Sequence, residues 1–284
     1  MSRGCAPYLV FGIVACARAF AAEADTLQQP TLEQSASTST AGANQPLGLR
    51  LAQKGQYTEI GLSHARETLS TDPRGWTDTQ VDLMHYFEPR KVLIGRATSS
   101  ERFGLHDDTL AVGAYHPLGE RTTAFAEISA SDTHRVLPRS SAQLQLSQSL
   151  PQGWGVMGGL KHVTYNVTTV DVAELTVERY FADYRAALSV YPSHSRTAGS
   201  ASSYRLQLSR YYGDENNIQI LYVNGVEVDK PTGVDSVLAV SVRSLALFGR
   251  HWLTREWALT YGLAKTEQGN TTRHAVNFGL RFRF

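Results

Sequence analysis

The chain has 284 residues and carries 27 Lys and Arg against 26 Asp and Glu, which gives a formal net charge of +1. This balance offers no basic excess, so we expect no nucleic acid partner. The length excludes several large domains but allows one large sheet. Past the N-terminus, no apolar run of about 18 residues predicts a membrane-spanning helix.

The first 21 residues have the pattern of a secretory signal peptide. A short basic start with Arg3 precedes an apolar core from Tyr8 to Ala17, and Ala19-Phe20-Ala21 forms an A-x-A cleavage site. We expect cleavage after Ala21, with Ala19 and Ala21 as the small residues of the site.

Both cysteines of the chain lie within this predicted signal. Cleavage would remove Cys5 and Cys16 and leave a mature chain without a disulfide. As an alternative, Ile13-Val14-Ala15-Cys16 resembles a lipoprotein cleavage box with Cys16 lipidated, although such an anchor would be redundant on an integral membrane protein. Residues 22–46, rich in Gln, Ser, Thr and Ala without periodicity, predict a disordered periplasmic tail.

Residues 47–284 predict one antiparallel barrel. Side chains of a strand point to opposite faces with period two, and from about Gln56 onward alternating segments follow one another with turn signals between them. We predict about fourteen strands, with twelve as the alternative count, at residues 56–67, 76–87, 92–102, 108–116, 122–134, 139–149, 154–165, 168–180, 183–192, 201–212, 217–228, 236–251, 256–267 and 272–284.

The predicted connections alternate in length. Pro151-Gln152-Gly153 and Ala182-Asp183 are short turns, whereas Thr68–Gly75 and Ser193–Ser200 belong to the longer alternate set. Short turns on one side and longer loops on the other are typical of outer-membrane barrels. We therefore expect an integral protein of the bacterial outer membrane, in contact with its lipid, with both termini on the periplasmic side.

The alternation sorts side chains into an apolar, lipid-facing set and a polar, lumen-facing set. Expected lipid-facing residues include Ile60, Leu62, Val81, Leu83, Phe87, Leu110, Val112, Leu144, Leu146, Leu175, Val177, Leu188, Val190, Tyr204, Leu206, Leu208, Leu259, Tyr261 and Leu263. In the strand at 236–251 the apolar face switches near Arg243-Ser244, which predicts a bulge. All four tryptophans, Trp76, Trp154, Trp252 and Trp257, lie at predicted strand ends, as aromatic girdles require.

The last predicted strand alternates strictly. Its apolar face carries Phe278, Leu280, Phe282 and Phe284, and its polar face carries Asn277, Gly279, Arg281 and Arg283. This pattern resembles the C-terminal signal of bacterial outer-membrane barrels. We predict that Asn277, Gly279, Phe282 and Phe284 form a membrane insertion signal for the barrel-assembly machinery.

The second half of the chain carries a more specific resemblance. The segments that carry it are Gly153–Leu160, Ala173–Tyr180, Ser203–Leu208 with Tyr211-Tyr212-Gly213, and Gly249–Trp257. They resemble the YaiO-type outer-membrane β-barrel family, over about Gln56 to Phe284. The resemblance implies an outer-membrane location and a barrel, and it implies no established activity.

Enzymatic and metal-binding chemistry has weak support. His194, within Ser193-His194-Ser195, loosely resembles the His-x-Ser of an outer-membrane deacylase, which makes a lipid-modifying rim enzyme the third hypothesis. No C-x-x-C or H-x-x-x-H spacing occurs, and Asp107-Asp108 is expected to be a solvated pair rather than a calcium site. We therefore expect no enzyme, no metal and no cofactor.

The lumen is the expected functional region. Fourteen strands tilted by about 40° imply a backbone diameter on the order of 28 Å and an opening of roughly 15 Å. Predicted lumen-facing binding residues are Arg185, Arg205, Arg243, Arg281, Glu174 and Glu178. Either the arginines form a ladder that selects small anionic solutes, or Arg and Glu pair across strands and brace a narrow lumen. A passive channel is the first hypothesis, and a structural or export-partner barrel is the alternative.

Overall fold

The computed structural model describes residues 56–284 except 214 and 230–237. The predicted cleavage residues Ala19 and Ala21, Cys16, the tail at 22–46 and the predicted start of the barrel at residue 47 lie outside the described residues.

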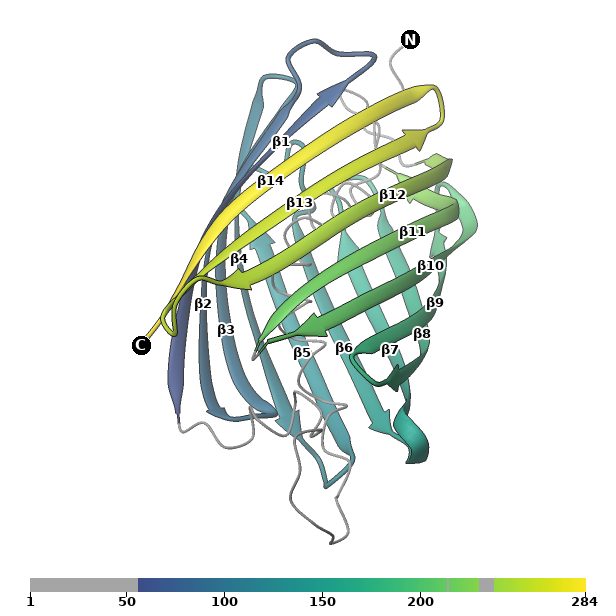
Figure 1. Ribbon diagram of the computed structural model, residues 1–284. Helices are drawn as coiled ribbons and strands as arrows, with labels where there is room; N and C mark the ends of the chain where they lie inside the picture. The colour runs from purple at the N-terminus through teal and green to yellow at the C-terminus, as the bar shows by residue number, and fades with distance from the viewer. Residues whose placement is uncertain (1–55, 214, 230–237) are drawn as a thin grey trace, which may run out of the picture.

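The described residues form one closed antiparallel barrel, drawn in Figure 1. Each strand pairs with its two neighbours along the chain, and β1 pairs with β14. The strands are β1 (Tyr57–Leu69), β2 (Trp76–Glu88), β3 (Lys91–Arg102), β4 (Leu105–Pro117), β5 (Thr122–Ser131), β6 (Ser140–Ser149), β7 (Trp154–Thr164), β8 (Thr169–Phe181), β9 (Tyr184–Ser195), β10 (Gly199–Tyr212), β11 (Asn216–Asp229), β12 (Leu238–Trp252), β13 (Trp257–Gln268) and β14 (Thr271–Arg283), with one 3₁₀ turn, η1 (Pro151–Gly153).

The predicted count of fourteen strands is confirmed, and the alternative count of twelve is wrong. The predicted bulge near Arg243-Ser244 is also wrong. β11 and β12 pair in one unbroken register, from Asn217 opposite Arg250 to Asp229 opposite Leu238. A register shift occurs instead between β2 and β3, at Tyr86 and Glu88, just before the short turn that joins those strands.

The start of β1 and the end of β14 lie at the same rim, because the strand number is even. We call the rim that carries Tyr57 and Phe284 the near rim, and the opposite one the far rim (Figure 1, bottom and top). β1 and β14 pair over eleven positions, from Glu59 opposite Arg283 to Leu69 opposite Arg273. Closure leaves no free strand edge, so every strand has a partner on each side.

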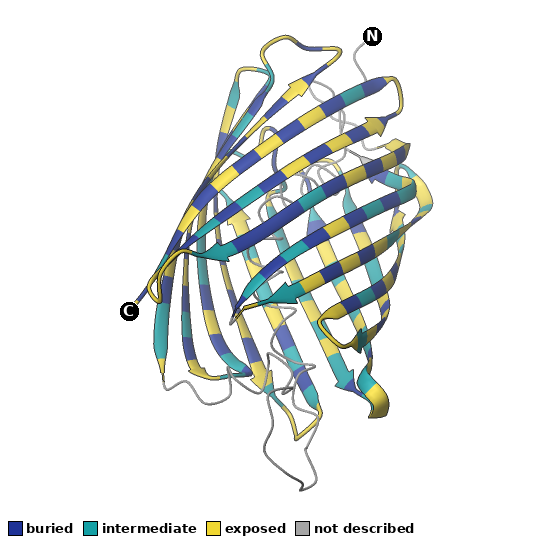
Figure 2. Ribbon diagram, viewed as in Figure 1, coloured by how far each residue is buried: buried dark blue, intermediate teal, exposed yellow. Residues whose placement is uncertain are grey.

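The two faces of the wall differ in chemistry: the outer face is mostly apolar, whereas the inner face combines polar and charged side chains with apolar clusters such as that of Met84, Ile94 and Phe125. Buried and exposed residues alternate along each strand, which gives the striped ribbons of Figure 2. Leucines such as Leu110 and Leu160 point outward and are each 68% exposed, whereas Glu67 and Asp107 point inward and are 0% exposed. An apolar exterior around an interior that holds the charged and polar groups is the arrangement that a lipid environment favours. Among the described residues, no helix is long and apolar enough to span a membrane.

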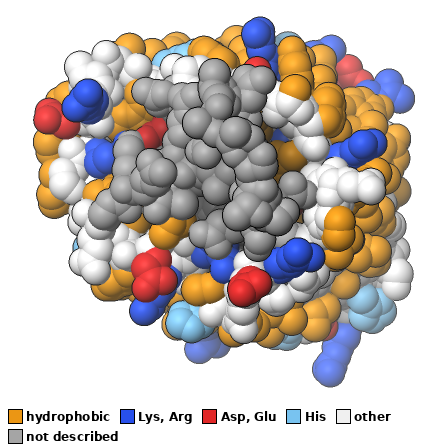
Figure 3. All heavy atoms as spheres, turned by 60° about the horizontal axis from the view of Figure 1, so that its bottom comes forward, with side chains coloured by type: hydrophobic (Ala, Val, Ile, Leu, Met, Phe, Trp, Pro, Cys, Tyr) orange, Lys and Arg blue, Asp and Glu red, His pale blue; other side chains and the backbone are white. Residues whose placement is uncertain are grey.

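The aromatic girdle is only partly as predicted. Trp154 and Trp257 point outward near the near rim, and Trp257 lies 4.7 Å from Phe282, centroid to centroid. Trp76 is 2% exposed inside the barrel, and Trp252 also points inward, beneath Arg283. Position at a strand end places a residue at a rim, but the parity of the strand decides its face. Figure 3, turned toward the near rim, shows hydrophobic side chains around the circumference.

We predict that charge on the lipid face costs stability according to depth. Leu263 is exposed near the middle of β13, and Thr68 is exposed next to the end of β1. Leu263→Arg should lower the free energy of unfolding in lipid vesicles by about 2–4 kcal/mol, and Thr68→Arg by about 0–1 kcal/mol. Denaturant titration of both refolded variants measures the difference, and equal losses would contradict a lipid-facing wall.

Candidate functional site

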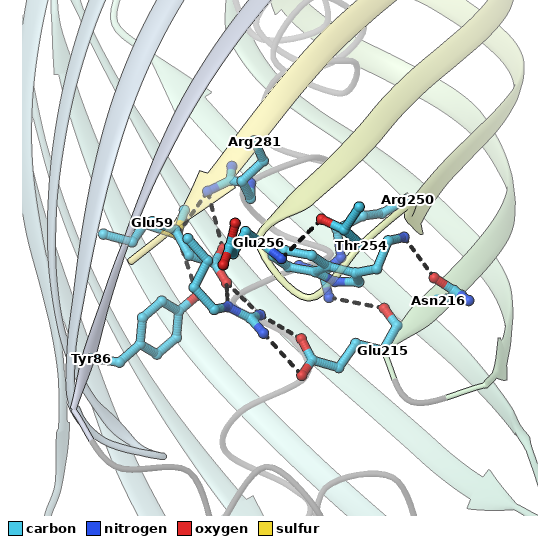
Figure 4. A network of polar contacts seen from close by, with 11 residues as sticks. Glu59, Tyr86, Glu215, Asn216, Arg250, Thr254, Glu256 and Arg281 are labelled. Carbon is cyan, nitrogen blue, oxygen red and sulfur yellow. Dashed lines mark hydrogen bonds and ion pairs between the residues drawn. The ribbon is translucent and has the colours of Figure 1, made fainter.

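Ion pairs connect several strands inside the near rim (Figure 4). We call Glu59, Asp82, Glu215, Arg281 and Arg283 the near-rim network. Arg283 donates from Nη2 to Glu59 Oε1 at 2.6 Å and from Nη1 to Glu215 Oε1 at 3.1 Å. Arg281 reaches Glu59 Oε2 at 3.4 Å and Asp82 Oδ2 at 3.0 Å. Each guanidinium therefore lies between two carboxylates.

The register explains how this network forms. Alternation in β14 turns Arg281 and Arg283 inward on either side of the outward Phe282. Glu59 lies directly opposite Arg283, whereas Gly61 lies opposite both Arg281 and Asp82. A Cβ atom on Gly61 would lie 2.5 Å from Asp82 Oδ1. The missing side chain at Gly61 thus lets Asp82 on β2 reach across β1 to Arg281 on β14.

The turn between β10 and β11 joins the same network. Glu215 in that turn is buried against Arg283, and its backbone oxygen accepts a 3.4 Å hydrogen bond from Arg250 Nη2. The next residue, Asn216, accepts a 2.7 Å hydrogen bond from the backbone N–H of Trp252. The Arg283 guanidinium lies 3.8 Å from the Trp252 ring centroid, a cation–π contact. The network therefore ties β1 and β14 to a turn that lies between strands β10 and β11.

A second buried cluster lies inside the far rim. Trp76 lies between two guanidinium groups, those of Arg102 and Arg273, each 5.1 Å from its ring centroid. Arg102 pairs with Asp78 at 3.6 Å, and Arg273 pairs with Glu67 at 3.5 Å. We call these five residues the far-rim cluster. Both ends of the interior therefore carry charges that are compensated by neighbours in the wall.

Most of the predicted lumen-facing residues do face inward. Arg185 donates from Nε to Glu178 Oε2 at 2.6 Å. Glu174 accepts hydrogen bonds from Gln145 Nε2 at 2.8 Å and from Tyr191 Oη at 2.9 Å. The Arg205 guanidinium lies 4.9 Å from the Tyr191 ring centroid, and Arg281 belongs to the near-rim network. Binding of a solute by these residues stays a prediction.

The placement of Arg243 is the exception, because its side chain is exposed on the outer face. β12 alternates without interruption, so Val242 and Ser244 face inward and Arg243 between them faces outward. The prediction was wrong because β12 carries apolar residues on both faces, which hid its parity. Arg250, which the sequence reasoning missed, is the inward arginine of this strand. Counting in steps of two from Ser244 would have found it.

The loosely suspected His-x-Ser pair does not form. His194 is exposed on the outer face and shares a 3.0 Å hydrogen bond with Ser200 Oγ, whereas Ser195 is buried inside the wall. Neighbours along a strand point to opposite faces, so the His194 ring cannot activate the Ser195 hydroxyl. Asp171 is engaged with His162 at 2.6 Å. Within the described ranges, no group of three His, Cys, Asp or Glu residues could hold a metal ion.

Hydrogen bonds hold the loop between β5 and β6 against the first residues of β4, which lie at the far rim. Asp107 is buried, and its Oδ2 accepts hydrogen bonds from the backbone N–H groups of Val136 at 2.7 Å and Leu137 at 2.9 Å. It is therefore not the solvated carboxylate that the sequence suggested. Asp132 in the loop accepts a 3.0 Å hydrogen bond from the Asp108 N–H. Backbone donors on Asp108 and Thr133 lower the pKa of Asp132 from its ordinary value.

A closed barrel with an apolar exterior and a charged interior defines a membrane-spanning β-barrel of the bacterial outer-membrane type. The family model described as the YaiO membrane beta barrel domain matches residues 57–230. The chain therefore belongs to the YaiO membrane β-barrel family, which confirms the resemblance found in the sequence.

Solved structures with the same fold include several outer-membrane proteins. A structure titled CymD monoaromatic hydrocarbon channel gives a TM-score of 0.52 at 11% identity and covers 91% of this chain and 97% of that one. A structure titled bacterial polysaccharide outer membrane secretin gives 0.51 at 10% identity, with 80% and 98% covered. At these identities the likeness shows the fold alone. No curated protein sequence matches the chain.

We predict that Glu59→Gln lowers the free energy of unfolding more than a substitution in a single, more accessible ion pair does. Glu59→Gln leaves Arg283 with Glu215 and Arg281 with Asp82, but it removes the carboxylate that both guanidiniums share. Breaking a buried pair costs about 3–5 kcal/mol. The matched control is Glu127→Gln, whose partner Arg96 lies 3.3 Å away in a more accessible part of the wall, and about 1 kcal/mol is expected there. Chemical unfolding measures both, and equal losses would contradict the network's importance.

We predict that Asp132 titrates in acid, below an Asp of an unfolded chain. Because its folded pKa is lowered, its contribution to loop stability is fully present above a pH of about 3.9 and is lost as the pH falls through the folded value. Carboxyl carbon shifts in NMR give the midpoint. A midpoint at or above about 3.9 would contradict the hydrogen bonds from Asp108 and Thr133.

Proposed function

We propose that this protein mediates passive passage of small polar solutes across the bacterial outer membrane through the barrel interior. The supporting observation is the set of buried polar and charged side chains on the inner face of a closed wall, which includes the near-rim network at one end and the far-rim cluster at the other. Apolar clusters such as that of Met84, Ile94 and Phe125 share this face with them. A barrel of fourteen strands has a backbone diameter on the order of 28 Å, which is wide enough for a lumen. The CymD structure, which is titled a channel, shares this fold and supports the proposal to that extent.

The arrangement of charges argues for weak rather than strong ionic selectivity. Arg185, Arg281 and Arg283 each lie against a carboxylate, so their positive charges are largely offset at the distance of a passing ion. Of the predicted arginines, Arg205 is half-buried on the inner face and stacks on Tyr191. Because Arg205 is only half-buried, a passing solute can reach it more readily than the buried arginines, and we therefore propose a modest preference for small anions at Arg205.

The alternative is a structural or export-partner barrel that works with a periplasmic or secreted component. The same ion pairs support it, because charges tied across strands such as Arg185 to Glu178 stabilise the wall without requiring that a solute pass. The outcome of a conductance measurement separates the two functions.

We predict steady single-channel conductance from the refolded mature chain in planar bilayers. Under a salt gradient the reversal potential should indicate a modest anion preference, and Arg205→Ala should shift it toward cations. Arg243→Ala is the matched control, because the outward Arg243 cannot contact ions in the lumen, and it should leave the reversal potential unchanged.

The absence of conductance from a well-folded barrel would overturn the channel and favour the export-partner alternative. A shift of equal size in the Arg243→Ala control would overturn the assignment of selectivity to the inner face.

A further inference from the structure

Exposed basic side chains gather on the outer face toward the far rim. Arg66 on β1, Arg243 on β12, Lys265 on β13 and His274 on β14 all point outward and are exposed. We call these four residues the outer basic patch. Their strands are consecutive around the barrel, in the order β1, β14, β13 and β12, and lie on the side toward the viewer in Figure 1.

The four residues lie at a similar depth. Arg66 lies three positions before Leu69, where β1 ends, and Lys265 lies three before Gln268, where β13 ends. His274 lies three positions after Thr271, where β14 begins, and it pairs directly with Lys265. Arg243 lies five positions after Leu238, where β12 begins. With strands about 4.8 Å apart, Arg66 and Arg243 lie about 14 Å apart across the strands. In the register Arg66 is level with Leu247, so the two arginines are also offset by four residues, about 13 Å, along the strands.

A largely apolar surface lies next to this patch, farther from the far rim. Leu245 and Leu263 are the next outward residues on β12 and β13, Val276 and then Phe278 follow on β14, and on β1 the exposed His64 precedes Leu62. All of these except His64 are exposed large hydrophobic residues on the outer face, where the barrel meets hydrocarbon. The basic side chains therefore lie at the boundary between the hydrocarbon and the headgroups, where Lys and Arg extend their charged ends toward the polar layer.

The charge of the patch is only partly compensated. Lys265 Nζ lies 3.0 Å from Glu267 Oε1, and Glu267 lies opposite Arg243 in the register. Neither Arg66 nor Arg243 forms an ion pair within the part of the chain that the structure describes. Among the described side chains, the two arginines, Lys265 and His274 thus surround the single carboxylate of Glu267. A second copy of the same patch would be repelled, so the complementary occupant is an anion.

Other outward arginines differ in their surroundings. Near the near rim, the Arg179 guanidinium lies 5.0 Å from the Trp154 ring centroid, and the Arg210 guanidinium lies 5.9 Å from that of Tyr184. Each is isolated on its own strand and stacks on an aromatic ring. They provide matched controls of the same residue type on the same outer face.

We propose that the outer basic patch binds a membrane lipid whose headgroup carries two phosphate groups. Guanidinium groups bind phosphate oxygens through paired, charge-assisted hydrogen bonds. Arg66 and Arg243, at the two sides of the patch, bind separate phosphates with Lys265 between them. The acyl chains lie along the apolar surface of Leu245, Leu263 and Phe278. This lipid site lies outside the barrel wall and is independent of solute passage through the lumen.

Native mass spectrometry of the purified full-length mature barrel tests the proposal. The probes are a glycolipid with two phosphates, phosphatidylglycerol with one, and zwitterionic phosphatidylcholine. The wild type should retain the diphosphorylated lipid in preference to the other two. Arg66→Gln, Arg243→Gln and Lys265→Gln together should weaken this binding about 100-fold, since each basic residue near a charged membrane surface contributes roughly fivefold.

Two further variants keep the result interpretable if the triple variant folds poorly. Arg179→Gln with Arg210→Gln should leave binding unchanged, and Glu267→Gln should strengthen it, because the competing carboxylate is removed. Equal binding by the wild type and the folded triple variant would overturn the proposal. Retention of phosphatidylglycerol equal to that of the diphosphorylated glycolipid would overturn the assignment to a headgroup with two phosphates. Weaker binding of the diphosphorylated glycolipid by the Glu267→Gln variant would overturn the electrostatic basis.

Discussion

The structure depends on one constraint, which is that hydrocarbon offers no water to hydrogen-bond a backbone amide. Each unsatisfied N–H or C=O in lipid costs several kcal/mol, so a sheet can cross a membrane only if it has no free edge. The eleven paired positions between β1 and β14 satisfy this requirement. Once the sheet is closed, the two faces must differ, and the apolar exterior and polar interior follow from the period of two along every strand.

Closure also explains where the buried charges lie. The first and last strands meet beside Glu59 and Arg283, and the ion pairs of the near-rim network cross that junction. A buried charge requires a partner because the effective dielectric is low, and here each guanidinium has two carboxylates. Gly61 is needed in the middle of this arrangement, since any side chain there would occupy the space of the Asp82 carboxylate. The role of Gly61 is therefore to leave space for the ion pair between Asp82 and Arg281, and not to allow a turn.

The sequence was sufficient for the strands, and for most of their faces, because strand periodicity is a local property. It was insufficient where both faces of a strand are apolar, as in β12, and this error placed Arg243 inside. It also could not supply the pairs of the candidate site. Arg283 and Glu215 come from different strands and a turn, and their contact depends on registers that no single segment encodes. Trp76 and Trp252 show the same limit, since position at a strand end does not fix the face.

The ion pairs between Glu59 and Arg283 join residues separated by 224 positions in the chain. They can form only when all fourteen strands are in place, because β14 reaches β1 last along the sequence. A barrel that stops short of β14 would hold Glu59 without either of its arginines and would leave the Glu215 carboxylate without its partner on β14. The buried carboxylates of the near-rim network are therefore paired with their arginines only in the fully assembled barrel, and an incomplete barrel leaves them unfavourably buried without those partners.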